Sequence, residues 1–124
     1  MFSNGAWSQI DLTVASAAPT VGVGSSLAAH MNTIATSEEV YFVAANQSVQ
    51  EVWSSAKAAP TWYSSNLFGI ASGTIVDADP GSPLTVAVDQ VVSPNRDEID
   101  YIGTDAAVHQ LWWTGSTGWT SVTP

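Results

Sequence analysis

The sequence predicts an all-β protein built from β-propeller blades, and three observations lead to this prediction. The apolar residues occur in short runs rich in Val, Ile, Tyr and Trp, bounded by Asn, Asp, Gly and Ser. The chain repeats itself with a unit of about 57 residues, a period typical of repeat folds. Each unit contains four such runs, and four short antiparallel strands per repeat form the blade of a propeller.

The repeat is visible when residues 40–53, VYFVAANQSVQEVW, are placed over residues 99–112, IDYIGTDAAVHQLW. Few residues are identical, but size and polarity recur at matched positions, as for Val49 with Val108, Glu51 with Gln110, and Trp53 with Trp112. The segment 25–35, SSLAAHMNTIA, would also suit a helix. It aligns with the strand-like LTVAVD of residues 84–89, so we predict a strand there instead.

Eight strands follow from this alignment. The first blade spans 27–67, with strands at 27–32, 39–45, 48–54 and 61–67, and the second spans 84–124, with strands at 84–90, 98–104, 107–113 and 118–123. Tight turns at Asn46-Gln47 and Asp105-Ala106 join the second and third strands of each blade, because polar residues tolerate the left-handed conformation.

Residues 1–13 are expected to form one extra outer strand, so that 1–124 is a single propeller segment. GAWSQIDLT (5–13) repeats the fourth strand, with Trp7 and Leu12 matching Trp62 and Leu67. Propellers close with four to eight blades, and a repeat cannot bury its apolar faces alone. The chain is therefore expected to close into a ring by homo-oligomerisation, and a trimer with six blades is favoured.

The charge balance narrows the possible partners. Two basic residues stand against eleven acidic ones, giving a net charge of −9. Such a surface repels nucleic acid and anionic lipid, so we expect neither nucleic acid nor membrane as a partner. The charge does not exclude neutral ligands or cations. The chain has no cysteine, no signal-peptide pattern and no run of about 20 apolar residues. Its localisation is not predicted, since secreted and cytoplasmic proteins both fit.

The sequence predicts neither catalysis nor metal binding. His30 and His109 are matched in the repeat by non-histidine residues and are interpreted as satisfied side chains, without a metal or acid–base role. The carboxylates of 76–81 and 95–100 are interpreted as solvated loop charge. No catalytic motif is present, so the chain is predicted not to be an enzyme and to need no cofactor.

The period of a strand separates the tryptophans. Trp53 and Trp112 share a face with Val49 and Val108 and are predicted to be core residues. Trp113 points to the other face, and it and Trp119 are equally consistent with packing and with a stacking platform for a ligand. Glu51 and Gln110 lie on the face that enters the blade interface, where each side chain either bonds to a backbone group or accepts a hydrogen bond from a ligand.

The second repeat, DEIDYIGTDAAVHQLWWTGSTGWT, resembles the blades of the fucose-binding β-propeller lectins of fungi and bacteria. Those blades run as an extended strand, a turn with Asn or Asp, and a strand ending in an acidic residue and a Trp, followed by a Gly-containing turn and a second Trp. The resemblance covers about residues 39–67 and 97–124. It implies a monosaccharide site between adjacent blades, built from an arginine, a glutamate and stacking tryptophans.

The resemblance places the site residues by position. Glu51 falls at the glutamate position and Gln110 replaces it in the second repeat; the stacking tryptophans are Trp62, Trp113 and Trp119. Ser54 stands where the first repeat should have its other ring. Val40 and Ile99 stand at or next to the arginine positions, so the guanidinium of the family site is missing from both repeats.

Two hypotheses of different class follow. The first is a lectin-like module that holds neutral, fucose-like sugars of glycans between blades, by stacking on tryptophan and by hydrogen bonds from Glu51 or Gln110. The second is a structural, self-assembling propeller fragment, natural or engineered, without a working sugar site. The missing arginines and the two-blade length both favour the second hypothesis.

Overall fold

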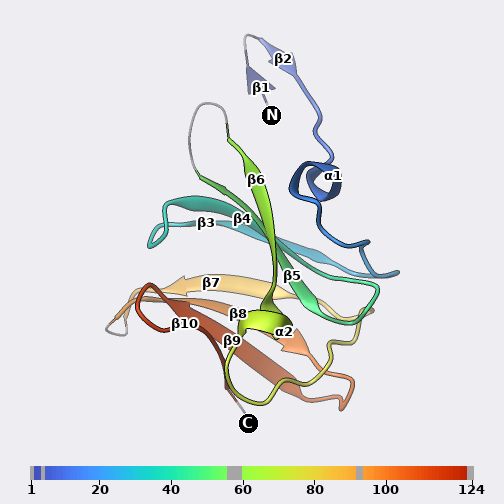
Figure 1. Ribbon diagram of the computed structural model, residues 1–124, viewed down its shortest axis with the longest axis vertical. Helices are drawn as coiled ribbons and strands as arrows, with labels where there is room; N and C mark the ends of the chain where they lie inside the picture. Colours follow the sequence, from blue (N-terminus) through green and yellow to red (C-terminus); the bar gives the residue numbers. More distant parts are fainter. Residues whose placement is uncertain (1, 4, 56–59, 92–93, 123–124) are drawn as a thin grey trace.

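The computed structural model describes residues 2–3, 5–55, 60–91 and 94–122. Two four-stranded antiparallel sheets make up most of the chain (Figure 1). The first sheet contains β3 (Leu27–Asn32), β4 (Ser37–Val43), β5 (Val49–Ser55) and β6 (Trp62–Asn66), in the order β3-β4-β5-β6. Each strand pairs with the next one along the chain, as in a propeller blade. We call this sheet blade 1.

The second sheet, blade 2, repeats this order with β7 (Thr85–Asp89), β8 (Arg96–Ile102), β9 (Val108–Thr114) and β10 (Gly118–Val122). The registers coincide as well. Ser54 pairs with Trp62 in blade 1, and Trp113 pairs with Trp119 at the matched positions of blade 2. The bridge between Val21 and Ala44 likewise recurs between Ala78 and Gly103. The alignment of the two repeats made from the sequence is therefore confirmed.

The strand boundaries differ from the prediction by one or two residues at most ends. The largest difference is at the second strand of each blade, which begins at Ser37 and Arg96 rather than at residues 39 and 98. The polar residues at these starts are typical of loops. Their backbones nevertheless extend the strand pairing, since Ser37 pairs with Ser55 and Arg96 pairs with Asp89. The predicted strand at 27–32 is confirmed with its bounds unchanged.

The two predicted turns are present, with a different residue in the left-handed conformation. Gln47 and Ala106 have φ values of 66° and 63°. The preceding Asn46 and Asp105 accept hydrogen bonds from the backbone N–H two residues on, at 3.2 and 3.0 Å. The polar side chain therefore stabilises each turn from the position before the strained residue.

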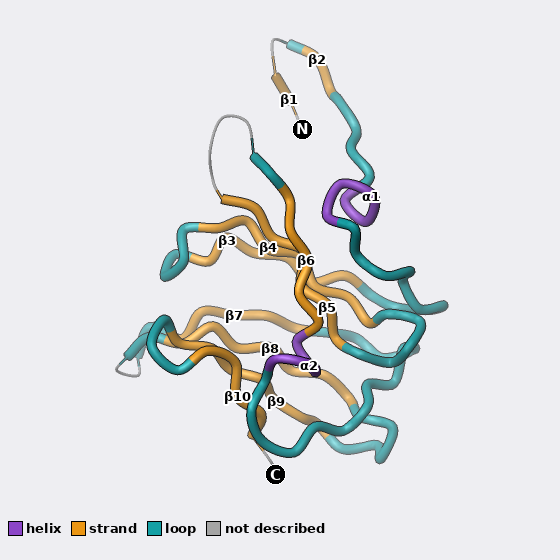
Figure 2. The backbone as a smooth tube through the Cα atoms, viewed as in Figure 1, coloured by secondary structure: helices purple, strands orange, loops and turns teal. Residues whose placement is uncertain are grey.

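Two short helices were not predicted from the sequence. α1 (Leu12–Ser16) and α2 (Leu67–Ile70) begin after Asp11 and Asn66, whose side chains accept hydrogen bonds from the first turns. Both follow the segment that carries Trp7 or Trp62. α2 contacts blade 1 and leads into a parallel bridge from Ser72 to Thr120 of blade 2 (Figure 2). None of the helices in the described part of the chain is long and apolar enough to cross a membrane.

Among the described residues, no strand pairing joins the segment expected as an extra outer strand to either blade. Its described residues contain β1 (Phe2–Ser3) and β2 (Ala6–Trp7), which pair with each other, and then α1. Figure 1 shows this hairpin apart from both sheets. An outer strand needs the ladder of an inner strand, and both outer edges beside β5 and β9 are already occupied by β6 and β10. Its use as an outer strand of another blade stays a prediction.

The main core lies between the two blades. Blade 1 and α2 contribute Tyr41, Val43, Val49 and Leu67, and blade 2 contributes Leu84, Ile99, Tyr101, Leu111 and Trp119. A smaller core of Phe42, Ala44 and Val52 lies on the other face of blade 1, under Leu12 and Ala18. The blades therefore pack face to face, as neighbouring blades do in a propeller.

Candidate functional site

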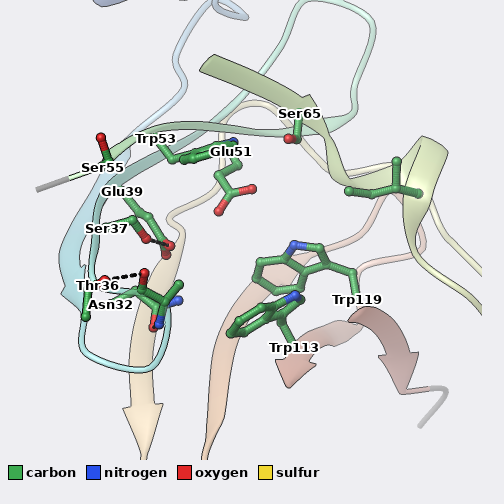
Figure 3. A pocket seen from close by; sticks show the side chains of 12 residues that line it. Asn32, Thr36, Ser37, Glu39, Glu51, Trp53, Ser55, Ser65, Trp113 and Trp119 are labelled. Atoms are coloured by element: carbon green, nitrogen blue, oxygen red, sulfur yellow. Dashed lines mark hydrogen bonds between the residues drawn. The ribbon is translucent and has the colours of Figure 1, made fainter. Parts of the chain in front are cut away.

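A cavity of about 350 Å³ opens between the two blades, near the ends of β4 and β5. Blade 1 supplies Glu39, Glu51 and Trp53 to its wall, and blade 2 supplies Trp113 and Trp119 (Figure 3). In Figure 3 the carboxyl group of Glu51 points into the space between Trp53 and the rings of Trp113 and Trp119. We call this cavity the inter-blade pocket.

The tryptophans of the pocket are held by the sheets that carry them. Trp113 and Trp119 are cross-strand partners on β9 and β10. Trp119 is only 7% exposed and meets the ring of Tyr41 edge-on, with centroids 6.3 Å apart. Trp53 stacks on its cross-strand partner Tyr63 at 4.7 Å. The rings are thus fixed before any ligand enters.

A polar cluster forms the inner wall of the pocket. The hydroxyl of Tyr41 donates a short hydrogen bond to Glu39, lies 3.0 Å from Oδ2 of Asp97, and lies 3.4 Å from Oε1 of Glu51. The three carboxyl groups are 4%, 0% and 7% exposed, in the order Glu39, Asp97, Glu51. A phenol has one proton to donate, so three ionised carboxylates cannot all be satisfied by Tyr41.

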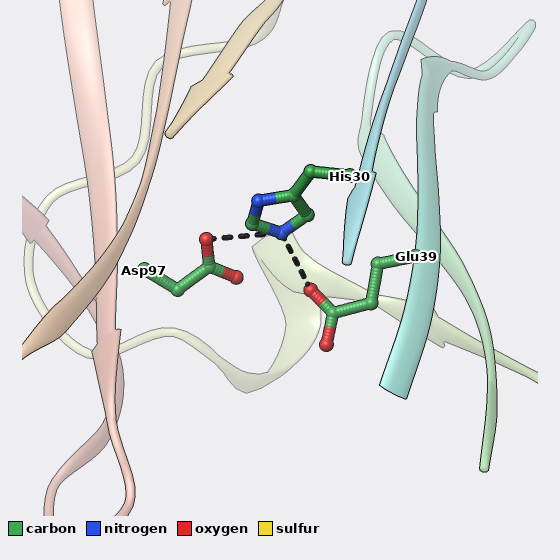
Figure 4. A group of neighbouring side chains, drawn as sticks. All are labelled: His30, Glu39 and Asp97. Atoms are coloured by element: carbon green, nitrogen blue, oxygen red, sulfur yellow. Dashed lines mark hydrogen bonds and ion pairs between the residues drawn. The ribbon is translucent and has the colours of Figure 1, made fainter. Parts of the chain in front are cut away.

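His30 supplies the positive charge of this cluster. Its Nε2 atom lies 3.0 Å from Oε2 of Glu39 and 3.2 Å from Oδ1 of Asp97 (Figure 4). Burial alone would lower the pKa of His30, but its interactions with Asp97 and Glu39 raise that pKa to about 9. The imidazole is therefore protonated at neutral pH and joins β3 and β4 of blade 1 to β8 of blade 2.

The carboxyl groups respond differently to the same surroundings. Burial, with the charges of Glu39 and Asp97, raises the pKa of Glu51 to about 8. Burial would also raise the pKa of Glu39, but hydrogen bonds from His30, Ser37 and Tyr41 outweigh it and the pKa lies below its usual value. Burial raises the pKa of Asp97. At neutral pH Glu51 thus carries a proton and Glu39 is ionised.

His30, Glu39 and Asp97 also form a group whose ligand atoms lie within 4.8 Å of one another. Such a set of one nitrogen and two oxygens has the composition of a metal site. The protonated imidazole already supplies the positive charge that the two carboxylates need. The cluster is therefore explained as an ion pair that connects the blades.

Three of the five residues predicted for a ligand site meet in the pocket. They are Glu51, Trp113 and Trp119. Trp62 instead lies on the opposite face of blade 1, half-buried against Phe42 and Val52. Gln110 lies on the opposite face of blade 2, where its side-chain amide donates to Oδ1 of Asp100 at 3.0 Å. Each of these two faces lacks a neighbouring blade within the described residues of the chain.

The core prediction for Trp53 and Trp112 is wrong for this chain. Both are only half-buried and neither belongs to a core cluster. Trp53 lines the pocket, and Trp112 lies beside Arg96, whose guanidinium carbon is 5.4 Å from the ring centroid. Val108, four residues before Trp112 on the same face, is 65% exposed, because no blade formed by the described residues covers that face.

The buried charges were missed from the sequence. The pattern predicts solvated loop charge at Asp97, yet this residue is fully buried; His30 is a satisfied side chain, as predicted, and its partners are Glu39 and Asp97. Strand alternation was the pattern that could have placed Asp97, since Ile99 and Tyr101 follow at intervals of two on the same face. His109 is satisfied, as expected, by Asp105 at 2.9 Å.

The fold defined by these sheets is that of two β-propeller blades. No family model and no curated protein matches the chain. Among solved structures it is similar to an arginine-to-alanine triple mutant of AofleA from Arthrobotrys oligospora, with a TM-score of 0.64 and 17% sequence identity. The match covers 98% of this chain and 33% of AofleA, so the chain spans about a third of its neighbour's length.

Proposed function

We propose that this chain is a carbohydrate-binding module of lectin type and that the inter-blade pocket is its ligand site. The observation that carries the proposal is the convergence of Trp53, Trp113 and Trp119 around the carboxyl group of Glu51 in one cavity. Aromatic faces complement the C–H face of a sugar ring, and a carboxyl group fixes hydroxyl groups by hydrogen bonds. The pocket volume of about 350 Å³ is sufficient for a monosaccharide.

The location of the pocket supports the same reading. The sequence resemblance implied a sugar site between adjacent blades, and the chain shares its fold with AofleA. A neutral, fucose-like monosaccharide would stack on Trp113 or Trp119 and accept or donate hydrogen bonds at Glu51. The arginine of the family site has no counterpart, since Ile99 is fully buried in the core and Val40 is half-buried on the other face of blade 1.

Trp62 and Gln110 serve this function only in an assembly. A second copy that places the outer face of its blade 2 beside α1, on the face of blade 1 that carries Phe42 and Val52, would bring Gln110 of one chain toward Trp62 of the other. Val40, Phe42 and Val52 already line an apolar cavity of about 310 Å³ on that face. Three chains would supply six blades, so the trimer remains our favoured ring, and several weak sites in one ring would act together.

Titration with L-fucose and a panel of neutral monosaccharides, followed by tryptophan fluorescence, tests the proposal. The indoles of the pocket should change intensity and emission wavelength at millimolar sugar, with saturation. An unchanged spectrum throughout the panel would contradict it.

The alternative is a structural propeller segment without a working sugar site. The observation that favours it is the missing arginine, because a guanidinium presents fixed donors that aliphatic side chains lack. This alternative predicts self-association of the chain and no response to any sugar in the same titration.

A further inference from the structure

The charges of the inter-blade pocket are those of a site for a cation. Among the described residues that line it there is no lysine or arginine, whereas Glu39 and Glu51 both contribute carboxyl groups. Among the described residues, His30 is the cation that contacts this cluster, at Glu39 and Asp97. Three carboxyl groups, those of Glu39, Glu51 and Asp97, therefore surround one imidazolium, in a protein of net charge −9.

Glu51 is the group in this cluster that is short of partners. It is only 7% exposed, and within the described chain its hydrogen-bond partner is Tyr41, at a long 3.4 Å. A protonated carboxyl group has one O–H to donate and oxygen lone pairs to accept with, so most of its capacity is unused. Figure 3 shows this group pointing into the pocket. A ligand that donates several hydrogen bonds would remove the cost of burying an under-bonded carboxyl.

The aromatic walls favour the same kind of ligand. Trp53, Trp113 and Trp119 surround the space that Glu51 enters. The face of an indole attracts a cation within about 6 Å of the ring centroid, and the attraction grows when the cation is desolvated. An ammonium group inside the pocket would therefore meet a carboxylate and aromatic rings at once, whereas a neutral hydroxyl would gain only the hydrogen bond.

We propose that the pocket binds a sugar that carries a free, protonated amine, such as a hexosamine, with the ring stacked on tryptophan and the ammonium donating to Glu51. This inference rests on the proposed function and names its ligand class. It also gives a reason for the missing arginine, because a guanidinium in this pocket would repel an ammonium group.

Binding of an ammonium group is coupled to the ionisation of Glu51. Four titratable groups face its carboxyl: His30 on β3, Glu39 and Tyr41 on β4, and Asp97 on β8. The pKa of Glu51 is about 8 in their presence, so Glu51 holds a proton at pH 7. An arriving ammonium favours the carboxylate and displaces that proton. Calorimetry at pH 7 in two buffers of different ionisation enthalpy should therefore show release of up to one proton per bound ligand.

The test is a fluorescence titration of the full chain at pH 7 and low salt with D-glucosamine, D-glucose and N-acetyl-D-glucosamine. The three share one ring, and only glucosamine carries an ammonium group. We expect glucosamine to bind at least tenfold more tightly than either neutral sugar, with a preference that falls as salt is added. L-fucose is included as the neutral reference for the proposed function, and choline as a cation without a sugar ring.

Two variants test whether the preference for glucosamine over glucose depends on Glu51. Glu51→Gln should reduce the ratio of glucosamine to glucose affinity to threefold or less, and it should fold because blade 2 carries glutamine at the matched position, Gln110. Glu38→Gln removes the same charge from an exposed position outside the pocket and should leave the ratio within twofold of the unmodified chain.

The outcomes are distinct. Glucose or fucose binding as tightly as glucosamine would overturn this inference and leave the proposed function in place. Choline binding as tightly as glucosamine would overturn the assignment to a sugar. If no sugar changes the fluorescence, the proposed function fails and this inference fails with it.

Discussion

His30 on blade 1 lies 3.2 Å from Asp97 on blade 2, from the Nε2 atom to Oδ1, so an ion pair crosses the interface between the two blades. The same imidazole lies 3.0 Å from Glu39. Both carboxyl groups are buried, since Glu39 and Asp97 are 4% and 0% exposed. The interface therefore depends on a proton that His30 holds and on a second proton that Glu51 holds.

Stability should fall as the pH rises from 6 to 8.5. The folded chain keeps the His30 proton to a pKa of about 9 and the Glu51 proton to about 8, whereas the unfolded chain releases them near 6.5 and 4.5. The folded state thus holds more protons in this range, and each one lowers the free energy of unfolding by at most about 1.4 kcal/mol per pH unit. Solvent screens the half-buried imidazole, so His30 contributes less than this limit to the change in the free energy of unfolding.

Urea unfolding at pH 6.0 and 8.5 checks this dependence. Glu51→Gln should show a shallower slope, because an amide has no proton to lose. Below about pH 4.5 the trend should reverse, since Glu39 has a lowered pKa and its stabilisation is lost as it takes up a proton. Equal or higher stability at pH 8.5 than at pH 6.0 would contradict the role given to the two protons.

Asp97→Ala should destabilise the chain by about 3 to 5 kcal/mol, because it leaves the buried charge of His30 with one partner and removes an acceptor from Tyr41. Glu38 occupies the matched position of blade 1 and is exposed, so Glu38→Ala should change stability by less than about 0.5 kcal/mol. Chemical denaturation measures both. Similar losses for the two variants would show that the ion pair across the blades contributes little.

Trp113→Ala should weaken binding of neutral sugars about fivefold, since a lost stacking contact is worth about 1 kcal/mol. The adjacent Trp112→Ala is the matched control, because Trp112 lies on the opposite face beside Arg96. Fluorescence or calorimetric titration at a concentration where the chain is monomeric gives both values. A larger loss from Trp112→Ala would place the site on the wrong face of blade 2.

Ala106→Gly should stabilise the chain by about 0.5 to 1 kcal/mol. Ala106 has a φ of 63° in the turn between β8 and β9, where a Cβ atom is unfavourable. Ala87→Gly, in the regular strand β7, should instead cost about 0.5 to 1 kcal/mol. Thermal or urea unfolding compares the pair, and a loss of the same size in both would refute the strain at position 106.

Val108→Asp should prevent assembly of the ring. Val108 is 65% exposed on the open face of blade 2, the face that would pack against blade 1 of another copy. Val91→Asp alters a 97% exposed valine outside the strands and should leave assembly unchanged. Sedimentation velocity over a concentration series distinguishes them. A wild-type chain that stays monomeric and folded at every concentration would end the ring hypothesis.

Much of the fold could be predicted from the sequence, because its two repeats can be aligned with each other. Val49 and Val108, or Trp62 and Trp119, occupy matched strand positions whatever their surroundings, so alignment alone located both blades. The helices α1 and α2 were not predictable in this way. They contain 5 and 4 residues, too few for a helical pattern, and depend on the caps Asp11 and Asn66.

The site was predictable only in part. Strand alternation brought Glu51 and Trp113 to faces that meet, but the partner of each face depends on which blade lies beside it. Trp62 and Trp119 are equivalent in sequence, yet only Trp119 faces another blade of this chain. The ion pair of His30 with Asp97 joins residues 67 positions apart and arises only when the two sheets pack, so no local pattern contains it.

The indole N–H resonances of the six tryptophans, followed by NMR during addition of a sugar, test the pocket most directly. We predict that the signals of Trp53, Trp113 and Trp119 shift together and saturate, while that of the 81% exposed Trp7 does not move. No shift in any signal, or shifts confined to Trp7, Trp62 and Trp112, would contradict a carbohydrate site between the two blades.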